Sequence, residues 1–182
     1  MCGDYMLKGD RLLLREVAKK DLHAYLRYWS DEDICKFDGG LKEIPTINDL
    51  YTYFDAIFRS KKKYLTIDNE KGVTVGYVTY ILIEEDDKKY IIGITIDKKF
   101  WGRGYGTEAM MVVMEYLFNE LDAESISLEV LLENERAGKC YRNCGFIAEK
   151  VKDEKIMIDG KYKDILVMKI NKKEFSKIVA KT

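Results

Sequence analysis

The spacing of apolar residues in the first third of the chain predicts one strand and two amphipathic helices. Residues 8–16 (KGDRLLLRE) have the composition of a strand, and residues 18–29 repeat apolar side chains at helical spacing. Residues 30–45 are rich in turn-forming residues. A second helix is expected after them, with Thr46 or Asn48 as its N-cap.

Three strands are predicted next, and they are expected to form an antiparallel meander. Residues 63–69 and 74–84 are joined by residues 70–72, which suit a short hairpin. Residues 90–96 are β-branched and apolar, as in a buried strand. A glycine-rich turn and an amphipathic helix over residues 107–121 follow.

The C-terminal third of the chain predicts three further strands, a short helix and a polar tail. The strands are residues 125–131, 147–153 and 162–170. A turn at Asp159 and Gly160 joins the last two strands. The short helix follows Asn134 and ends at Gly145, and residues 171–182 are expected to form a polar helix or a frayed end.

The composition agrees with a folded domain and excludes several classes of partner. Of 182 residues, 47% are apolar, 35% are charged and one is proline, which is typical of a globular chain. With no internal repeat or linker, a single domain is expected over residues 1–182. The net charge of −1 gives no bulk electrostatic reason to bind nucleic acid or an anionic membrane. No signal peptide or membrane span is predicted, so we expect a soluble, cytoplasmic protein.

The cysteines and the single histidine give little support for a metal site. None of the four cysteines forms a C-x-x-C pair, and His23 is far from them in sequence. A Ser-His-Asp triad has little support either, and His23 is expected on the surface. Cys140 and Cys144 lie four residues apart on a predicted helix, where two reduced packing thiols are favoured over a redox pair.

The glycines after the meander carry the candidate chemistry. Gly102, Gly104 and Gly106 lie between a buried strand and a helix N-terminus, an arrangement that favours binding of a phosphate. A Walker loop is not indicated, because no lysine follows Gly106. The dinucleotide fingerprint G-x-G-x-x-G begins at Gly102 but fails at Thr107.

Residues 100–109 (FWGRGYGTEA) resemble the acetyl-CoA-binding loop of the GNAT N-acetyltransferases, and the branch resembled most closely includes the ribosomal-protein N-terminal acetyltransferases. A second segment is similar to the family's L-x-V…N…R-A…Y…G-F signature, at Leu128, Val130, Asn134, Arg136, Ala137, Tyr141, Gly145 and Phe146. Residues 159–164, with Met168, are similar to the closing hairpin of that branch. The chain departs from the family at Trp101, where glutamine or arginine is usual.

The resemblance implies a set of contacts to acetyl-CoA. Asn134 is expected to bind the pantetheine amides, and a role as helix N-cap fits it as well. Lys139 and Arg142 either meet the 3′-phosphate or remain solvated. The remaining contacts are a strand for the pantetheine arm and backbone amides for the pyrophosphate, at Ile94, Ile96, Arg103, Gly104, Gly106 and Thr107.

The catalytic role implied by the resemblance falls on Tyr141. Its phenol would protonate the departing CoA thiolate, and the alternative is a tyrosine that only packs on the sheet. A bulge at Gly93 would bring a backbone N–H near Ile94 to the thioester carbonyl, and simple packing room is an equal alternative. The general base is open between Glu84, Glu85 and bulk solvent.

The resemblance covers nearly the whole chain and implies an α+β fold. The expected architecture is a strongly twisted mixed sheet of about six or seven strands, splayed at the cofactor site, with about four helices. The implied activity is direct transfer of acetyl from acetyl-CoA to a primary amine, without a metal. The amine belongs to a protein N-terminus or a small molecule. An inactive CoA-binding or regulatory module and a nucleotide-binding module are the alternatives, and a monomer or homodimer is expected.

Overall fold

The computed structural model describes residues 6–38, 43–84, 88–158 and 160–180. The strands are β1 (Met6–Lys8), β2 (Leu12–Glu16), β3 (Lys63–Asn69), β4 (Thr74–Glu84), β5 (Lys89–Ile96), β6 (Ser125–Leu131), β7 (Ile147–Val151), β8 (Ile156–Ile158), β9 (Lys161–Lys163) and β10 (Ile165–Asn171). The α-helices are α1 (Leu22–Ser30), α2 (Glu32–Asp38), α3 (Ile47–Thr52), α4 (Phe54–Phe58), α5 (Tyr105–Asn119), α6 (Glu135–Asn143) and α7 (Lys172–Val179).

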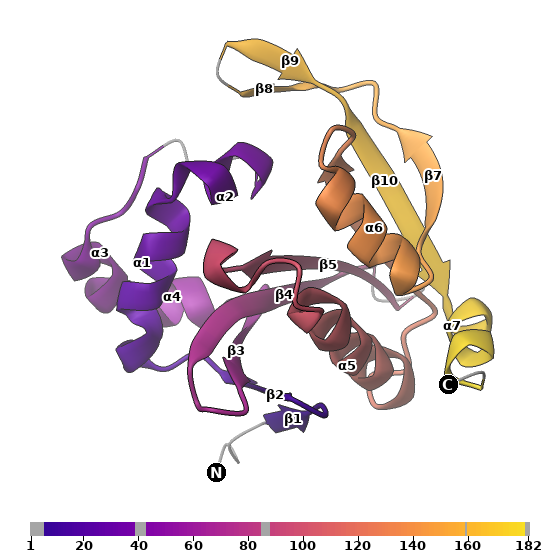
Figure 1. Ribbon diagram of the computed structural model, residues 1–182, viewed down its shortest axis with the longest axis horizontal. Helices are drawn as coiled ribbons and strands as arrows, with labels where there is room; N and C mark the ends of the chain where they lie inside the picture. The colour runs from indigo at the N-terminus through magenta and orange to yellow at the C-terminus, as the bar shows by residue number, and fades with distance from the viewer. Residues whose placement is uncertain (1–5, 39–42, 85–87, 159, 181–182) are drawn as a thin grey trace.

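A single mixed sheet organises the fold. Within the described residues, eight strands follow the order β1-β2-β3-β4-β5-β6-β10-β7, and β8 pairs with β9 in a hairpin that projects from the body of the molecule (Figure 1). β5 and β6 are parallel, whereas the neighbouring pairs β4–β5 and β6–β10 are antiparallel. The predicted α+β class is confirmed, with more strands and helices than the sequence indicated.

Helices cover both faces of the sheet and create two separate cores. α5, α6 and α7 cover one face, where five residues of α5 have no exposed area, namely Ala109, Met110, Val113, Met114 and Leu117. α1 to α4 cover the other face around an aromatic cluster that includes Tyr25, Tyr28, Phe54 and Phe58. Successive residues of β4 serve both cores, because Tyr77 joins the aromatic cluster and Val78 joins the core under α5.

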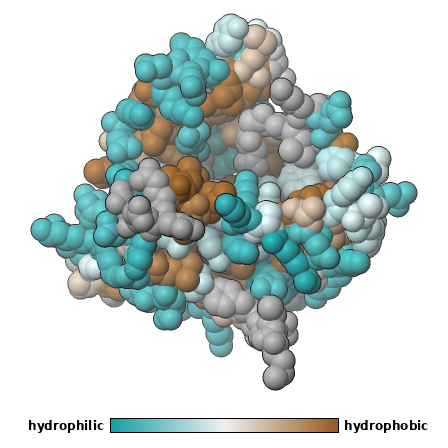
Figure 2. Space-filling view, turned by 180° about the vertical axis from the view of Figure 1, so that it is seen from behind, coloured by the Kyte–Doolittle hydropathy of each residue, from teal (hydrophilic) through white to brown (hydrophobic). Residues whose placement is uncertain are grey.

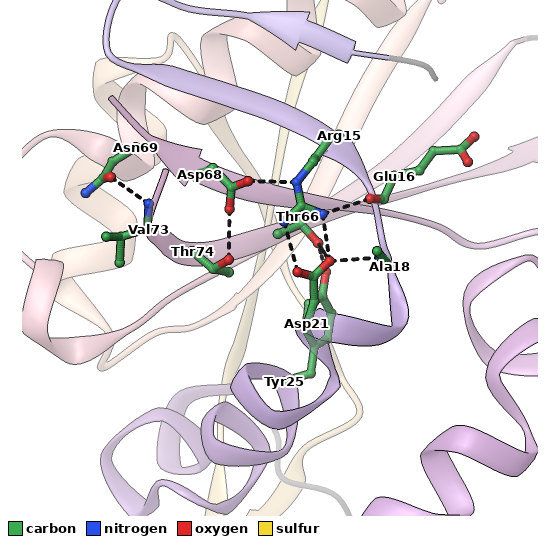
Figure 3. Close-up of polar contacts among 10 residues, drawn as sticks. All are labelled: Arg15, Glu16, Ala18, Asp21, Tyr25, Thr66, Asp68, Asn69, Val73 and Thr74. Carbon is green, nitrogen blue, oxygen red and sulfur yellow. Dashed lines mark hydrogen bonds and ion pairs between the residues drawn. The ribbon is translucent and has the colours of Figure 1, made fainter. Parts of the chain in front are cut away.

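A buried polar network fastens the start of α1 to the sheet (Figure 3). Arg15 of β2 donates two hydrogen bonds to the carboxylate of Asp21, at 2.7 and 2.9 Å, and a third to Asp68 of β3, at 2.7 Å. Asp21 also accepts the backbone N–H of Ala18 and the hydroxyl of Thr66, at 2.8 and 3.1 Å. Asp21, which immediately precedes α1, is thereby held against two strands.

The N-terminal segments differ from the sequence prediction. Residues 8–16 form the end of β1, a turn and β2, because the backbone N–H of Gly9 closes a turn onto the carbonyl of Leu12 at 2.9 Å. The turn-rich segment at 30–45 contains the short helix α2, whose first turn is capped by the carboxylate of Asp31. Both β1 and α2 are too short for a periodic pattern of apolar residues to reveal them.

The second predicted helix starts where it was predicted, but it is divided into two short helices, α3 and α4. Thr46 is the N-cap, and its hydroxyl accepts the backbone N–H of Asp49 at 3.2 Å. The helix is interrupted at Tyr53 and resumes as α4. Thr52 and Tyr53 at the break are both weak helix formers, because β-branched and aromatic side chains lose rotamer freedom in a helix.

The closing segment is more elaborate than two strands joined by one turn. β7 and β10 pair antiparallel as expected, but the hairpin β8–β9 is inserted between them. The predicted turn lies in this hairpin, where Gly160 has a φ of 72°, and Asp159 lies outside the described residues. The polar C-terminal helix is α7, capped by the side chain of Asn171.

Candidate active site

The adjacent parallel strands β5 and β6 pair at one end only and then separate, which leaves one edge of β5 open. β5 pairs with β6 only over Lys89–Ile91. The carbonyl of Tyr90 faces β6, since it accepts the hydroxyl of Ser127 at 3.4 Å, and the carbonyl of Ile96 accepts the indole N–H of Trp101 at 2.6 Å. Because backbone groups alternate along an antiparallel strand, the N–H and C=O of Ile94 face the same open edge. The edge therefore offers Ile94 as an unpaired donor and acceptor within the described structure.

The glycine-rich loop ends at the N-terminus of α5. Gly102 and Gly104 have φ values of 73° and 83°, a left-handed conformation that glycine adopts at little cost. Gly104 is the N-cap of α5, and Gly106 lies in the first turn. A Cβ on Gly106 would have room, since its nearest neighbours, Cys140 Sγ and a carbon of Ile96, would lie at 3.5 and 3.7 Å. The packing of the protein itself therefore does not require glycine at 106.

Arg11, which the sequence analysis did not single out, braces this loop from outside. Its backbone N–H and its Nε donate to the carboxylate of Glu108 at 2.6 and 2.9 Å. Its Nη1 donates to the carbonyl of Arg103 at 3.2 Å. The turn between β1 and β2 is thus tied to the loop and to the first turn of α5.

A first cavity of about 420 Å³ lies between the open edge of β5, the glycine loop, α6 and α2. Seven predicted site residues line it, namely Ile94, Ile96, Gly104, Gly106, Thr107, Asn134 and Tyr141. Lys139 also lines it. Arg103 does not, and its guanidinium lies over the ring of Phe100, 5.5 Å from the centroid. Arg142 is also outside the lining, and it lies beside Gly138.

Asn134 and Tyr141 are held firmly at opposite ends of α6. The carboxamide oxygen of Asn134 accepts the backbone N–H of Ala137 at 3.2 Å, so the N-cap role is observed. Its side-chain NH₂ remains as a second polar group beside the cavity. Tyr141 is only 6% exposed and packs edge-to-face against Phe146, 6.2 Å between ring centroids. Both residues combine a structural role with a position on the cavity wall.

Trp101 has a clear structural role. Its indole N–H donates to the carbonyl of Ile96, and the guanidinium of Arg136 stacks over its ring at 3.2 Å from the centroid. Arg136 also lies 5.5 Å from the ring of Phe37 on α2. In the sequence Arg136 stands out only as part of a motif, and no local pattern indicates that it links α6 to Trp101 and α2 across the cavity.

Of the two alternatives left open at Gly93, packing room is observed and a bulge is not. The pairing of β4 with β5 runs without a shift from Gly76 to Leu82, and Gly93 lies opposite Thr79. A Cβ at Gly93 would lie 3.1 Å from the hydroxyl of Thr79, so the glycine provides packing room between the strands. The side chains of both general-base candidates, Glu84 and Glu85, lie outside the described part of the structure.

A second cavity, of about 510 Å³, opens on the other face of the sheet. It shares Ile34 and the stretch Gly93, Ile94 and Thr95 with the first cavity. Its wall is mainly aromatic and aliphatic, with Tyr28, Trp29, Pro45, Ile57, Tyr64 and Tyr77, and two charged residues, Glu43 and Lys62, contribute to its lining. Seen from behind, the molecule is hollowed in its upper half, with apolar side chains on the borders of the hollow (Figure 2).

The described residues contain no membrane-crossing helix and no metal cluster. No helix among them is long and apolar enough to span a bilayer. No group of three or more histidine, cysteine, aspartate or glutamate side chains in the same residues is arranged to hold a metal ion. His23 is exposed on α1, as expected.

Comparison with known proteins connects this geometry to a family. The family model of the acetyltransferase (GNAT) domain matches residues 11–147. A spermidine N(1)-acetyltransferase of Vibrio cholerae is 25% identical over 171 residues, which cover 89% of this chain and 94% of that protein. An uncharacterized N-acetyltransferase, p20, of Bacillus licheniformis is 23% identical over 179 residues, covering 93% and 98%. The crystal structure of spermidine N-acetyltransferase from Vibrio cholerae in complex with CoA and spermine has a TM-score of 0.83 at 23% identity, covering 91% of this chain and 98% of that one.

The matched segment contains the splayed strands, the glycine loop and α6, which together form the site. The chain therefore belongs to the GNAT family of acetyltransferases. Its activity is acetyl-CoA-dependent N-acetylation, with acetyl-CoA as co-substrate. The relatives named above are spermidine and other N-acetyltransferases, so the resemblance to the ribosomal-protein branch stays a prediction.

Proposed function

We propose that the chain transfers acetyl from acetyl-CoA directly to a primary amine that enters through the second cavity. The observation that carries this proposal is the stretch Gly93–Thr95, which lines both cavities. A thioester in the first cavity and an amine in the second would meet at this stretch. Direct transfer needs such an approach, because the nucleophile must come within about 3–3.5 Å of the carbonyl carbon.

The residues of the first cavity fit acetyl-CoA, which supplies the activated acetyl thioester. Ile94 can pair with the pantetheine amides as an added strand would, whereas the carbonyl of Ile96 is already taken by Trp101. The backbone amides of Gly104, Gly106 and Thr107 suit the pyrophosphate at the N-terminus of α5. Arg103 contributes its backbone amide in this proposal, because its side chain lies over Phe100.

Gly106→Ala tests this placement of the cofactor. The added methyl group has room in the protein alone, so the melting temperature should not fall. The same methyl group would occupy space beside the pyrophosphate, and the Kd for acetyl-CoA should rise about tenfold, or ~1.4 kcal/mol. Calorimetric titration and a thermal melt of the same sample measure both effects. An unchanged Kd for acetyl-CoA would show that the pyrophosphate does not bind at the first turn of α5.

Within the site, Tyr141 is the proposed proton donor to the departing thiolate. It lines the first cavity from α6, and a phenol can act as a general acid. The N–H of Ile94 is the proposed hydrogen-bond donor to the thioester carbonyl. No base is assigned, so the amine would lose its proton to solvent that enters the second cavity or to a residue outside the described ranges.

The second cavity supports a small amine or an extended N-terminus as acceptor. Its aromatic rings, from Trp29, Tyr64 and Tyr77, suit an ammonium group or an apolar chain. Glu43 can pair with a second cation of a polyamine, and Lys62 with a carboxylate. The relatives named for spermidine make polyamines the first acceptors to test, and the ribosomal-protein resemblance adds peptide N-termini.

A panel of amines with detection of released thiol tests the function. We expect turnover with at least one polyamine, amino-acid amide or short peptide. Ile57→Trp should then raise KM for the amine by about tenfold, because the larger ring fills the second cavity, and should leave KM for acetyl-CoA unchanged. Ile147→Trp is the matched control, since Ile147 is 57% exposed on β7 and lines neither cavity.

Two outcomes of the panel would overturn the proposal. Binding of acetyl-CoA without turnover of any amine would favour the inactive CoA-binding module. If Ile57→Trp changes KM for acetyl-CoA and leaves KM for the amine unchanged, the acceptor does not bind in the second cavity.

The cytoplasmic location and the monomeric or homodimeric state stay predictions from the sequence.

A further inference from the structure

A thiol faces the first cavity beside the glycine loop. Cys140 of α6 lines the cavity, and its Sγ lies 3.4 Å from the hydroxyl oxygen of Thr107 in the first turn of α5. Cys144, four residues later, is fully buried, and its Sγ lies 3.7 Å from the carbonyl oxygen of Thr107. Of these two thiols, Cys140 borders the cavity and Cys144 belongs to the core.

The first turn of α5 favours a negative charge at Cys140. The backbone N–H of Glu108 is bonded to Gly104 at 3.1 Å, so the three preceding N–H groups of the turn have no partner within the helix. The sulfur lies against this turn, since a Cβ on Gly106 would be 3.5 Å away. Unpaired amides and the helix dipole stabilise an anion there.

The neighbouring thiol acts in the same direction. The hydrogen bond from Cys144 lowers the pKa of Cys140, burial opposes this shift, and the hydrogen bond with Thr107 adds to it. The pKa of Cys144 is raised by the same bond and by burial. Cys140 is thus the thiol of the pair that ionises first, and the thiolate is the reactive form of cysteine.

We propose that Cys140 is a reversible modification site for low-molecular-weight disulfides, and that a mixed disulfide at this position blocks acetyl-CoA binding. The inference rests on the proposed placement of the pyrophosphate beside Gly106. The thiolate of Cys140 attacks one sulfur of the disulfide, a new bond to Sγ forms, the original S–S bond breaks, and the other half leaves as a thiolate. A thiol reductant reverses the exchange.

Acetyl-CoA and the modification exclude each other. A pyrophosphate at the first turn of α5 would bring negative charge next to Cys140, which disfavours its thiolate, and would also cover the sulfur. A group attached to Sγ would in turn occupy the space beside Gly106 and Thr107. Cofactor-bound protein is therefore protected, and cofactor-free protein is open to modification.

Oxidised glutathione is the probe, with intact-protein and peptide mass spectrometry as the readout. A Cys2→Ser, Cys35→Ser background removes the other two thiols. In this background one glutathione should attach at Cys140, and acetyl-CoA at about ten times its Kd should slow attachment about tenfold. The Kd for acetyl-CoA should rise at least about tenfold on modification and return after reduction.

Two matched variants in the same background separate Cys140 from general effects. Cys140→Ser should lose the adduct, and its own Kd for acetyl-CoA should be the same before and after treatment. Cys144→Ser should still form the adduct, because a serine hydroxyl can also donate to Cys140. An adduct on Cys144, a rate indifferent to acetyl-CoA, or an unchanged Kd after modification would each overturn the proposal. Loss of two hydrogens without an adduct would identify a Cys140–Cys144 disulfide and overturn it too.

Failure of this inference can be told apart from failure of the cofactor placement. If Gly106→Ala weakens acetyl-CoA binding while the Cys140 adduct does not, the placement stands and the modification proposal is wrong. If neither change affects acetyl-CoA binding, the pyrophosphate does not lie beside Gly106 and both proposals are wrong.

Discussion

Replacing Tyr141 with phenylalanine is expected to lower kcat by about 10²-fold or more, because a positioned general acid typically contributes about 10²–10⁴-fold. The ring would keep its edge-to-face contact with Phe146 at 6.2 Å, so the packing of α6 should survive. The Kd for acetyl-CoA should therefore stay close to that of the unmodified chain. Steady-state kinetics with an accepted amine and calorimetric titration measure the two quantities.

Tyr116→Phe is the control for loss of a hydroxyl group as such. Tyr116 is half-buried on α5 and lines neither cavity, so its variant should retain normal kcat. A pH profile adds a second readout, since the alkaline limb of kcat should be absent from Tyr141→Phe if the phenol donates the proton. Normal kcat in Tyr141→Phe would exclude the phenol as the acid.

The second large effect is expected on stability, from Arg15→Ala. This change leaves the carboxylate of Asp21, which is 3% exposed, without its cationic partner. Removing one member of a buried ion pair typically costs about 3–5 kcal/mol. Urea denaturation should show this loss in the free energy of unfolding. Arg59→Ala is the matched control, because the Arg59–Asp55 pair is 72% and 78% exposed and should contribute no more than about 0.5 kcal/mol.

The same network makes stability depend on pH. Burial pushes the pKa of Asp21 upward, but the hydrogen bonds from Arg15 and Ala18 and the guanidinium charge outweigh it, and the pKa lies below its ordinary value. The contribution of Asp21 is present above the unfolded pKa of about 3.9 and is lost as pH falls through the lower folded value. Asp21→Asn should lower stability near neutral pH and flatten the decline below about pH 4. Parallel pH curves for the two proteins would contradict this role.

The local sequence pattern predicted the strands and helices correctly where an element is long and regular. β3, β4 and β6 coincide with their predicted ranges. β3 and β4 are rich in β-branched and aromatic residues, and β6 places Ile126, Leu128 and Val130 at alternate positions. α2 and the β8–β9 hairpin were missed because they are too short for periodicity to appear. The break at Tyr53 was missed because Leu50, Phe54 and Phe58 keep helical spacing across it.

For the site, sequence reasoning found residues that are close together in the chain. The glycine loop and the α6 positions fall within two short segments, and most of them line one cavity. The contacts that support them join distant residues, as in Arg11 with Glu108 and Arg136 with Trp101. No local pattern encodes such pairs. Trp101 looked like a defect in the motif only because its partner, the carbonyl of Ile96, depends on the fold.

The two cores on opposite faces of the sheet support different cavities. The helices next to the first cavity belong mainly to the core under α5, whereas the wall of the second cavity is built largely from the aromatic core of α1 to α4. The two cores share the sheet but few side chains. If the second cavity binds the amine, as we propose, substitutions among Trp29, Ile57 and Tyr64 can accumulate and change the choice of amine over evolutionary time, while the residues around the first cavity stay unchanged.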